Sequence, residues 1–149
     1  MKYNLARFKS AQESCYGQVY EEIKNGEKTG HWMWFTFPQL TGLGISSKSR
    51  HYAIQNLEEA YEYLTDEILS SRLCELTEIL IFEVNGKTSQ EIFGFTDSLK
   101  FHSSMTLFHI AVSKHSDLAV NQRFRSFEQA IIKYFDGKLD LRTIELLGE

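Results

Sequence analysis

The sequence predicts an all-α protein, built as an irregular multihelical bundle of about seven to eight helices in a single domain over residues 1–149. Three observations lead to this prediction. Apolar residues recur at spacings of three and four along most of the chain, many of these runs are bounded by capping residues and Asn-Gly or Asp-Gly pairs, and no pair of alternating strands is found. A length of 149 residues is typical of one domain with its own hydrophobic core.

The first helix is expected near the N-terminus, where Asn25-Gly26 ends it because glycine readily adopts the left-handed conformation of a helix C-terminus. The aromatic run 31–38 fits either a short buried helix or an extended segment. Pro38 is expected to keep Phe37 out of the helical region. The apolar stripe of the first helix consists of Leu5, Phe8, Tyr16, Val19, Tyr20 and Ile23.

The positions of the remaining helices follow from their capping residues. A serine of the loop 41–47 caps a short helix over 48–54, and a further helix is expected over Asn56–Leu64 with the asparagine as its cap. Thr88 and Glu91 form a capping box for a helix of one or two turns. The other helices are expected over residues 66–84, from Thr96 or Asp97 to His115, from Asp117 to Phe135, and over 139–147.

Composition and charge disfavour several classes of function. No stretch reaches the roughly 18 apolar residues that a membrane span needs, and the first ten residues contain no continuous apolar segment of a signal peptide, so a cytoplasmic protein is expected. A formal net charge of −4 makes nucleic-acid binding unfavourable, and Glu128 interrupts the basic residues Arg123, Arg125 and Lys133. The two cysteines are expected to be reduced thiols in the core. No metal site and no cofactor are indicated.

Two segments contain no Asp or Glu, and they carry the residues most suited to bind a ligand. The first lies between Glu27 and Glu58, and the second between Asp97 and Asp117. An acid-poor surface favours an anionic partner, although buried segments also lack charge. The candidate ligand-binding residues in these segments are Trp32, Trp34, Gln39, Gly42, Gly44, Ser46, Ser47, Lys100, Ser103 and Ser104.

Each of these residue types has its own chemistry. The two tryptophans and Phe35 can stack on a flat group, although large aromatics more often fill a core. The loop 42–47 can offer backbone amides to a phosphate at a helix N-terminus. Lys100 supplies a positive charge, or alternatively pairs with Asp97 on the surface. His31 is the candidate catalytic acid or base, because histidine titrates near neutral pH.

Several segments carry motifs that recur together in a known family. The similarity extends over nearly the whole chain and is looser over Ser49–His51. The motifs are His31-Trp32-Met33-Trp34-Phe35-x-Phe37-Pro38-Gln39, Gly42-Leu43-Gly44, Tyr52-Ala53-Ile54, Leu99-Lys100-x-x-Ser103-Ser104-Met105-Thr106-Leu107-Phe108, Tyr134-Phe135-x-Gly137, and Leu5-x-Arg7-Phe8 with Ala11-Gln12. In these motifs the chain resembles the domain-of-unknown-function 1810 family. The resemblance implies a multihelical single-domain fold and brings no established activity.

Two hypotheses of function remain open at this point. In the first, the 31–47 and 97–108 segments form a pocket for a small anionic, nucleotide-like ligand, with hydrolytic or ADP-ribose-type chemistry as an extension. In the second, the chain is a noncatalytic protein-interaction or structural module, and the same motif residues serve as core and capping residues. The sequence leaves the oligomeric state open.

Overall fold

The computed structural model describes residues 2–149, and over this range it is all-helical, as the sequence predicts. Seven of its eleven α-helices contain seven or more residues, close to the number expected. Within the same range, no helix combines the length and apolarity needed to cross a membrane. The elements are α1 (Ala6–Glu13), α2 (Tyr16–Lys24), α3 (Met33–Thr36), α4 (Ser47–His51), α5 (Leu57–Thr65), α6 (Glu67–Phe82), α7 (Ser89–Phe93), α8 (Phe95–Ser113), α9 (Ser116–Ala119), the 3₁₀ helix η1 (Gln122–Arg125), α10 (Ser126–Phe135) and α11 (Leu141–Leu147).

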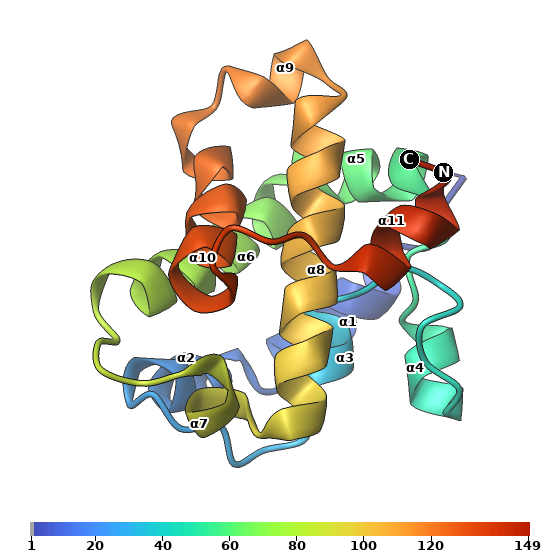
Figure 1. Cartoon of the computed structure of the whole chain (residues 1–149). Coiled ribbons are helices and arrows are strands. Elements are labelled where there is room, and N and C mark those ends of the chain that lie inside the picture. The colour runs from blue at the N-terminus through green and yellow to red at the C-terminus, as the bar shows by residue number, and fades with distance from the viewer. Residues whose placement is uncertain (1) are drawn as a thin grey trace.

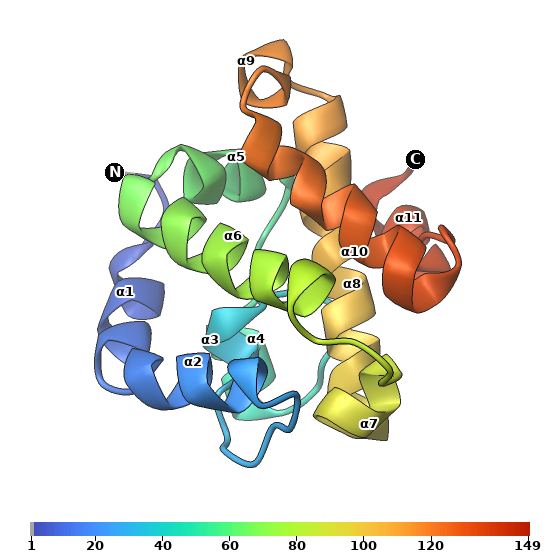
Figure 2. The same ribbon diagram turned by 90° about the vertical axis from the view of Figure 1, so that its left-hand side faces the viewer.

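Helix α8 runs through the centre of the molecule, and helices α5, α7 and α10 pack against it (Figures 1 and 2). Its residues 103–108 are all buried. Because successive residues of a helix point about 100° apart, six consecutive buried residues cover the whole circumference. This stretch of α8 therefore has no face in solvent, which explains why it consists of apolar and small hydroxyl residues without a charge.

Aromatic rings join α8 to the elements around it. Phe101 of α8 meets Phe37, which follows α3, with ring centroids 5.2 Å apart and the rings nearly perpendicular. Tyr63 of α5 contacts Phe8 of α1 at 5.2 Å and Phe108 of α8 at 5.1 Å. Each such pair contributes about 0.5–1.5 kcal/mol beyond the burial of its area. The aromatic motif around residue 35 thus belongs largely to the core.

The expected first helix is divided into two. The apolar stripe from Leu5 to Ile23 is shared between α1 and α2, which are separated at Cys15, where φ is −144°. Gln12, at the end of α1, is buried, and its amide donates to the carbonyl of Phe35 at 2.7 Å and to the hydroxyl of Tyr63 at 3.1 Å. These contacts come from distant parts of the chain, so local periodicity could not reveal the break.

Two other expected boundaries are also wrong. Helix α8 begins directly after Gly94, whose φ is +84°, so neither Thr96 nor Asp97 is its cap. The carboxylate of Asp97 pairs instead with lysines. The single helix expected over 117–135 is broken into α9, η1 and α10, and the side chain of Asn121 caps η1.

Most of the capping predictions are confirmed. The side chain of Ser46 accepts a hydrogen bond from the amide of Ser49 at the start of α4, and Asn56 caps α5 in the same way. Asp66, which was not predicted as a cap, caps α6. Both halves of the capping box at Thr88 are present. The aromatic run forms the single turn α3, and Phe37 lies outside the helical region, as expected from Pro38. Local hydrogen-bonding rules therefore account for most helix starts.

A nearly buried ion pair ties α1 to α5 and to the end of the loop that follows α4. Arg7 Nη1 lies 2.9 Å from Glu59 Oε2, and the Glu59 side chain is only 1% exposed. Arg7 also donates from Nε to the carbonyl of His51 and from Nη2 to that of Ala53, at 2.9 and 2.8 Å. The second carboxylate oxygen of Glu59 accepts the amide of Gln55 at 2.8 Å. The Arg7–Glu59 pair thus connects α1, α5 and residues 51–55.

Replacing Glu59 with Gln should lower the free energy of unfolding by about 3–5 kcal/mol, because the guanidinium of Arg7 then stays in the interior without a counter-charge. Urea denaturation measures the change. Glu58→Gln is the matched control, since Glu58 pairs with Lys2 at 3.1 Å on the exposed surface and should change stability by less than about 1 kcal/mol. Equal effects of the two substitutions would contradict the importance assigned to the Arg7–Glu59 pair.

Candidate functional site

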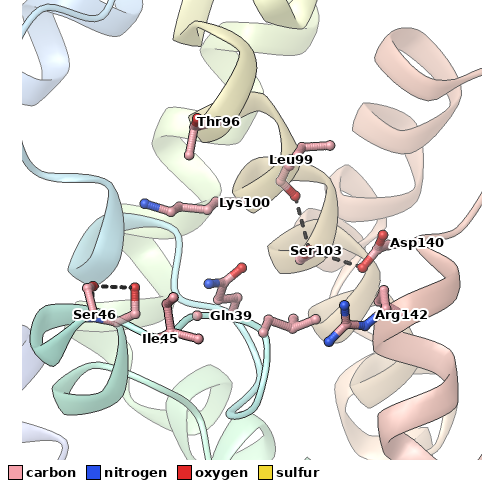
Figure 3. A pocket seen from close by; sticks show the side chains of 12 residues that line it. Gln39, Ile45, Ser46, Thr96, Leu99, Lys100, Ser103, Asp140 and Arg142 are labelled. Carbon is pink, nitrogen blue, oxygen red and sulfur yellow. Dashed lines mark hydrogen bonds between the residues drawn. The ribbon is translucent and has the colours of Figure 1, made fainter.

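A pocket of about 430 Å³ opens where three segments meet, and its volume lies within the range of small-molecule sites. The segments are the loop 39–49, the first half of α8 and the start of α11. Figure 3 shows Lys100 and Arg142 entering from different segments, with Gln39 between them in this view. The lining residues are Gln39, Leu43, Gly44, Ile45, Ser46, Ser49, Thr96, Leu99, Lys100, Ser103, Asp140 and Arg142.

The loop wall is closed at its base by backbone hydrogen bonds. An isolated parallel bridge joins Leu40 to Ile54, with the amide of Thr41 donating to the carbonyl of Ile54 at 2.8 Å and the amide of Ile54 donating to that of Gln39 at 2.9 Å. This bridge fixes the point at which the Gln39 side chain leaves the backbone. The segment between its two ends then carries the pocket residues Leu43, Gly44, Ile45, Ser46 and Ser49.

Gly44 allows the loop to fold closely onto α4. A Cβ built on this glycine would overlap Cβ and Oγ of Ser49, and it would also come within 3.3 Å of Nε2 of Gln39. Ser49 in turn lies in the first turn of α4, where its amide donates to Ser46 Oγ at 3.1 Å. The glycine is thus required by packing, because a side chain here would displace Ser49 and crowd Gln39 of the pocket lining.

The α8 wall consists of four residues on one face of the helix. Thr96, Leu99, Lys100 and Ser103 follow one another at spacings of three, one and three, which places them in one stripe. Since the following residues 103–108 of α8 are packed in the core, this stripe is held in place. It is the part of α8 from which side chains can reach a ligand.

Asp140 anchors α11 to α8 at the third wall. Its Oδ2 accepts hydrogen bonds from Ser103 Oγ at 3.0 Å, from Thr143 Oγ1 at 2.6 Å and from the amide of Thr143 at 3.2 Å. Its own amide donates to Thr106 Oγ1 of α8 at 3.0 Å. One of the two oxygens of this carboxylate, Oδ2, is therefore occupied inside the protein.

The charge of Lys100 is only partly balanced. Its Nζ is 3.4 Å from Asp97 Oδ1, whereas Lys28 Nζ is closer to the other oxygen of Asp97, at 2.7 Å. One carboxylate thus serves two lysines, and the trio keeps a net positive charge. The ammonium groups of Lys48 and Lys100 also lie over the ring of Trp34, at 4.9 and 5.0 Å from its centroid.

Arg142 supplies the second positive charge of the pocket. Among residues 2–149 its guanidinium forms neither an ion pair nor a side-chain hydrogen bond. A planar guanidinium binds carboxylate and phosphate oxygens in a bidentate manner. The pocket lining therefore carries two positive charges against the one negative charge of Asp140.

The predicted site residues divide into those that line the pocket and those that do not. Gln39, Gly44, Ser46, Lys100 and Ser103 come together in its lining. His31, Gly42 and Ser47 are exposed elsewhere on the surface, and Trp34 lies against Lys100 without lining the pocket. Ser104 is fully buried on another side of α8, and its hydroxyl has no hydrogen-bond partner among the described residues.

Trp32 lies inside the protein, where Glu22 holds it. It is 2% exposed, and its Nε1 donates to Glu22 Oε1 at 2.9 Å. The same carboxylate accepts the amides of Thr29 and Gly30 at 2.7 and 2.8 Å, and Gln18 Nε2 at 2.8 Å. Burial alone would raise the pKa of Glu22, but these hydrogen bonds outweigh it and lower the pKa from 4.5 to about 2. Trp32 is thus a core residue with a satisfied indole.

Sequence reasoning missed seven lining residues, and they differ in how detectable they were. Thr96 and Leu99 share a helical stripe with Lys100, so the periodicity around that lysine could have revealed them. Arg142 and Asp140 lie far along the chain, and no local signal connects them with the two acid-free segments. The remaining missed residues are Leu43, Ile45 and Ser49.

Two of the three basic residues considered for nucleic-acid binding, Arg123 and Lys133, have partners within the described chain. Arg123 forms a bidentate interaction with Glu78, with distances of 3.1 Å from Nε and 2.9 Å from Nη2. Lys133 Nζ donates to the carbonyls of Leu80, Ile81 and Val84 at 2.8, 2.7 and 2.5 Å, around the end of α6. The charged groups of Arg123 and Lys133 are thus used in contacts with α6 and the residues that follow it.

Comparisons with known proteins agree with the fold and add no activity. The family described as "Protein of unknown function (DUF1810)" matches residues 2–147. The crystal structure of the conserved hypothetical protein Rv1873 from Mycobacterium tuberculosis is similar over 100% of this chain and 99% of its own, with 42% sequence identity and a TM-score of 0.90. No curated protein gave a significant match.

Glu22→Gln should destabilise the protein at neutral pH by about 1–2 kcal/mol after allowance for solvent screening. Because the pKa of Glu22 is lowered on folding, its contribution is present above pH 4.5 and is lost as the pH falls toward about 2. The difference in unfolding free energy between wild type and variant should therefore shrink over that interval in denaturation curves. A difference that is flat with pH, as expected for the exposed neighbour Glu21→Gln, would argue against this role.

Gly44→Ala should lower the unfolding free energy by about 1–3 kcal/mol, because the added methyl group forces Ser49 and the loop apart. Gly17→Ala is the control: Gly17 lies in α2 with no atom near its missing Cβ, so alanine should raise stability by about 0.4–1 kcal/mol. Thermal denaturation of both variants measures the contrast. A neutral Gly44→Ala would mean that the loop adapts freely.

Proposed function

The chain belongs to the DUF1810 family of proteins of unknown function, and from the geometry of its pocket we propose that it binds a small anionic molecule there. One observation carries the proposal: Lys100 and Arg142, from separate segments, line the same pocket, while Asp140 has one carboxylate oxygen occupied by three internal hydrogen bonds. Two cationic groups around a concave site attract and orient an anion.

Polar side chains of the loop can complete the binding of an anionic group. Gln39 contributes an amide, and Ser46, Ser49 and Thr96 contribute hydroxyls to the lining. Ser46 and Ser49 are joined by a hydrogen bond of 2.9 Å between their hydroxyls, which leaves one of these hydrogens free for a ligand. The recognition would thus combine two charges with neutral donors.

The proposal concerns binding and assigns no reaction step. His31, the candidate acid or base, is exposed and does not line the pocket. The nucleotide-like character expected from the aromatic run is also not part of the proposal, because Trp32 is buried, and neither Trp34 nor Phe35 lines the pocket.

A second candidate function is a noncatalytic interaction or structural module. It is favoured by the observation that many motif residues are core or capping residues: Trp32, Met33 and Phe37 are buried, and Ser46 caps α4. This candidate predicts that no small anion binds in the pocket. The binding experiment below therefore separates the two.

Lys100→Met and Arg142→Met should each weaken binding of an anion by about 10- to 100-fold, since a hydrogen bond to a charged group contributes about 1.5–3 kcal/mol. Isothermal titration with inorganic phosphate, AMP and small dicarboxylates provides the measurement. Lys24→Met is the control, because Lys24 lies exposed on α2 and does not line the pocket. If no anion in the panel binds the wild type, or if Lys24→Met weakens binding equally, the proposal is wrong.

A further inference from the structure

The apolar part of the pocket points to the kind of anion it takes. Its apolar lining residues are Leu43, Ile45 and Leu99, and all three are aliphatic. An aromatic base is usually held between or against aromatic rings, whereas an alkyl chain packs well on aliphatic side chains. The lining therefore favours an aliphatic ligand.

The aromatic rings considered as stacking partners are engaged in the protein itself. Trp34 lies against the ammonium groups of Lys48 and Lys100. Phe35 meets the ring of Tyr52 edge to face, with centroids 5.4 Å apart. None of these rings belongs to the pocket lining, so a nucleobase would find no stacking partner there.

The apolar surface of the pocket remains uncovered by the chain itself. Ile45 is 86% exposed and Leu99 is 55% exposed, although both line a concave site. Removing such surface from water is favourable in proportion to its area. A ligand with an alkyl segment would cover it, whereas a bare inorganic anion would leave it in solvent.

The two positive charges add a second condition. Lys100 comes from α8 and Arg142 from α11, and Figure 3 shows them on either side of Gln39. A single small anion at Lys100 leaves Arg142 without an ion-pair partner, and one at Arg142 leaves Lys100 with only its share of Asp97, at 3.4 Å. An anionic group at each end of an alkyl segment would reach both, with the carboxylate at Arg142 held in the bidentate manner that suits a guanidinium.

We infer that the ligand is an aliphatic dianion, with an alkyl segment over Leu43 and Leu99 and its two anionic groups at Lys100 and Arg142. This inference rests on the proposed function, because it specifies the ligand of the same pocket. Linear dicarboxylates have this chemistry in its simplest form. Ser46, Ser49 and Gln39 would add hydrogen bonds to the anionic groups.

The test is isothermal titration of the intact protein with succinate, adipate, suberate and sebacate, beside octanoate, AMP and inorganic phosphate. Affinity should rise by at most about fourfold per methylene that gains contact, then level off or fall once the chain exceeds the pocket. The best dicarboxylate should bind at least about tenfold more tightly than octanoate, AMP or phosphate. Arg142→Met should reduce the affinity for the best dicarboxylate to that for octanoate.

Leu99→Asn should weaken the best dicarboxylate about fivefold or more while leaving the weak binding of phosphate unchanged. Leu141→Asn is the matched control, since Leu141 is also an exposed leucine but does not line this pocket. Because Trp34 contacts Lys100, its fluorescence should change when the ligand binds, and this change should be absent in Trp34→Phe. Fluorescence therefore reports the position of the ligand independently of the measured heat of binding.

Three outcomes would overturn the inference in distinguishable ways. If AMP binds more tightly than every dicarboxylate, or if affinity does not vary with chain length, the aliphatic character is wrong while anion binding stands. If octanoate binds as tightly as suberate, the inferred second anionic group of the ligand is wrong. If none of the compounds binds, the proposed function itself fails together with this inference.

Discussion

The structure depends on the burial of residues 103–108 of helix α8 on all sides. A helical stretch without a solvent face must be surrounded, and here α5, α7 and α10 pack against α8. Phe101 and Phe108 of α8 are fully buried and contact the rings of Phe37 and Tyr63. Because α8 is immobilised, the few side chains that emerge from its first half are held in fixed positions, as a binding site requires.

The pocket inherits its rigidity from α8 and its shape from two irregular segments. The loop 39–49 is closed by the Leu40–Ile54 bridge and tightened at Gly44. The start of α11 is fixed by Asp140, whose hydrogen bonds to Ser103 and Thr143 connect two helices. A charged group that is hydrogen-bonded so extensively fixes geometry, because leaving its partners unpaired would be costly. The cations of the pocket have fewer such partners.

The absence of acid in two segments has a different physical cause in each. In the second segment burial accounts for residues 103–108, which lie in the core and cannot carry charge. In the first segment the residues 41–51 are mostly exposed, so burial does not explain why Lys48 and Arg50 stand there without an acid. The same pattern, a segment without Asp or Glu, can thus arise from burial or from a positively charged surface. Only the exposure of each residue in the structure distinguishes the two causes.

The sequence by itself determined the all-α class, the family and most helix starts, because caps such as Ser46, Asn56 and Thr88 act within a few residues. It also indicated Gln39, Gly44, Ser46, Lys100 and Ser103, which the structure brings into one pocket. Only the tertiary structure decided that Trp32 is core, that α1 and α2 are separate, and that Arg142 faces Lys100's pocket. These outcomes depend on contacts between distant segments, and local periodicity carries no information about such contacts.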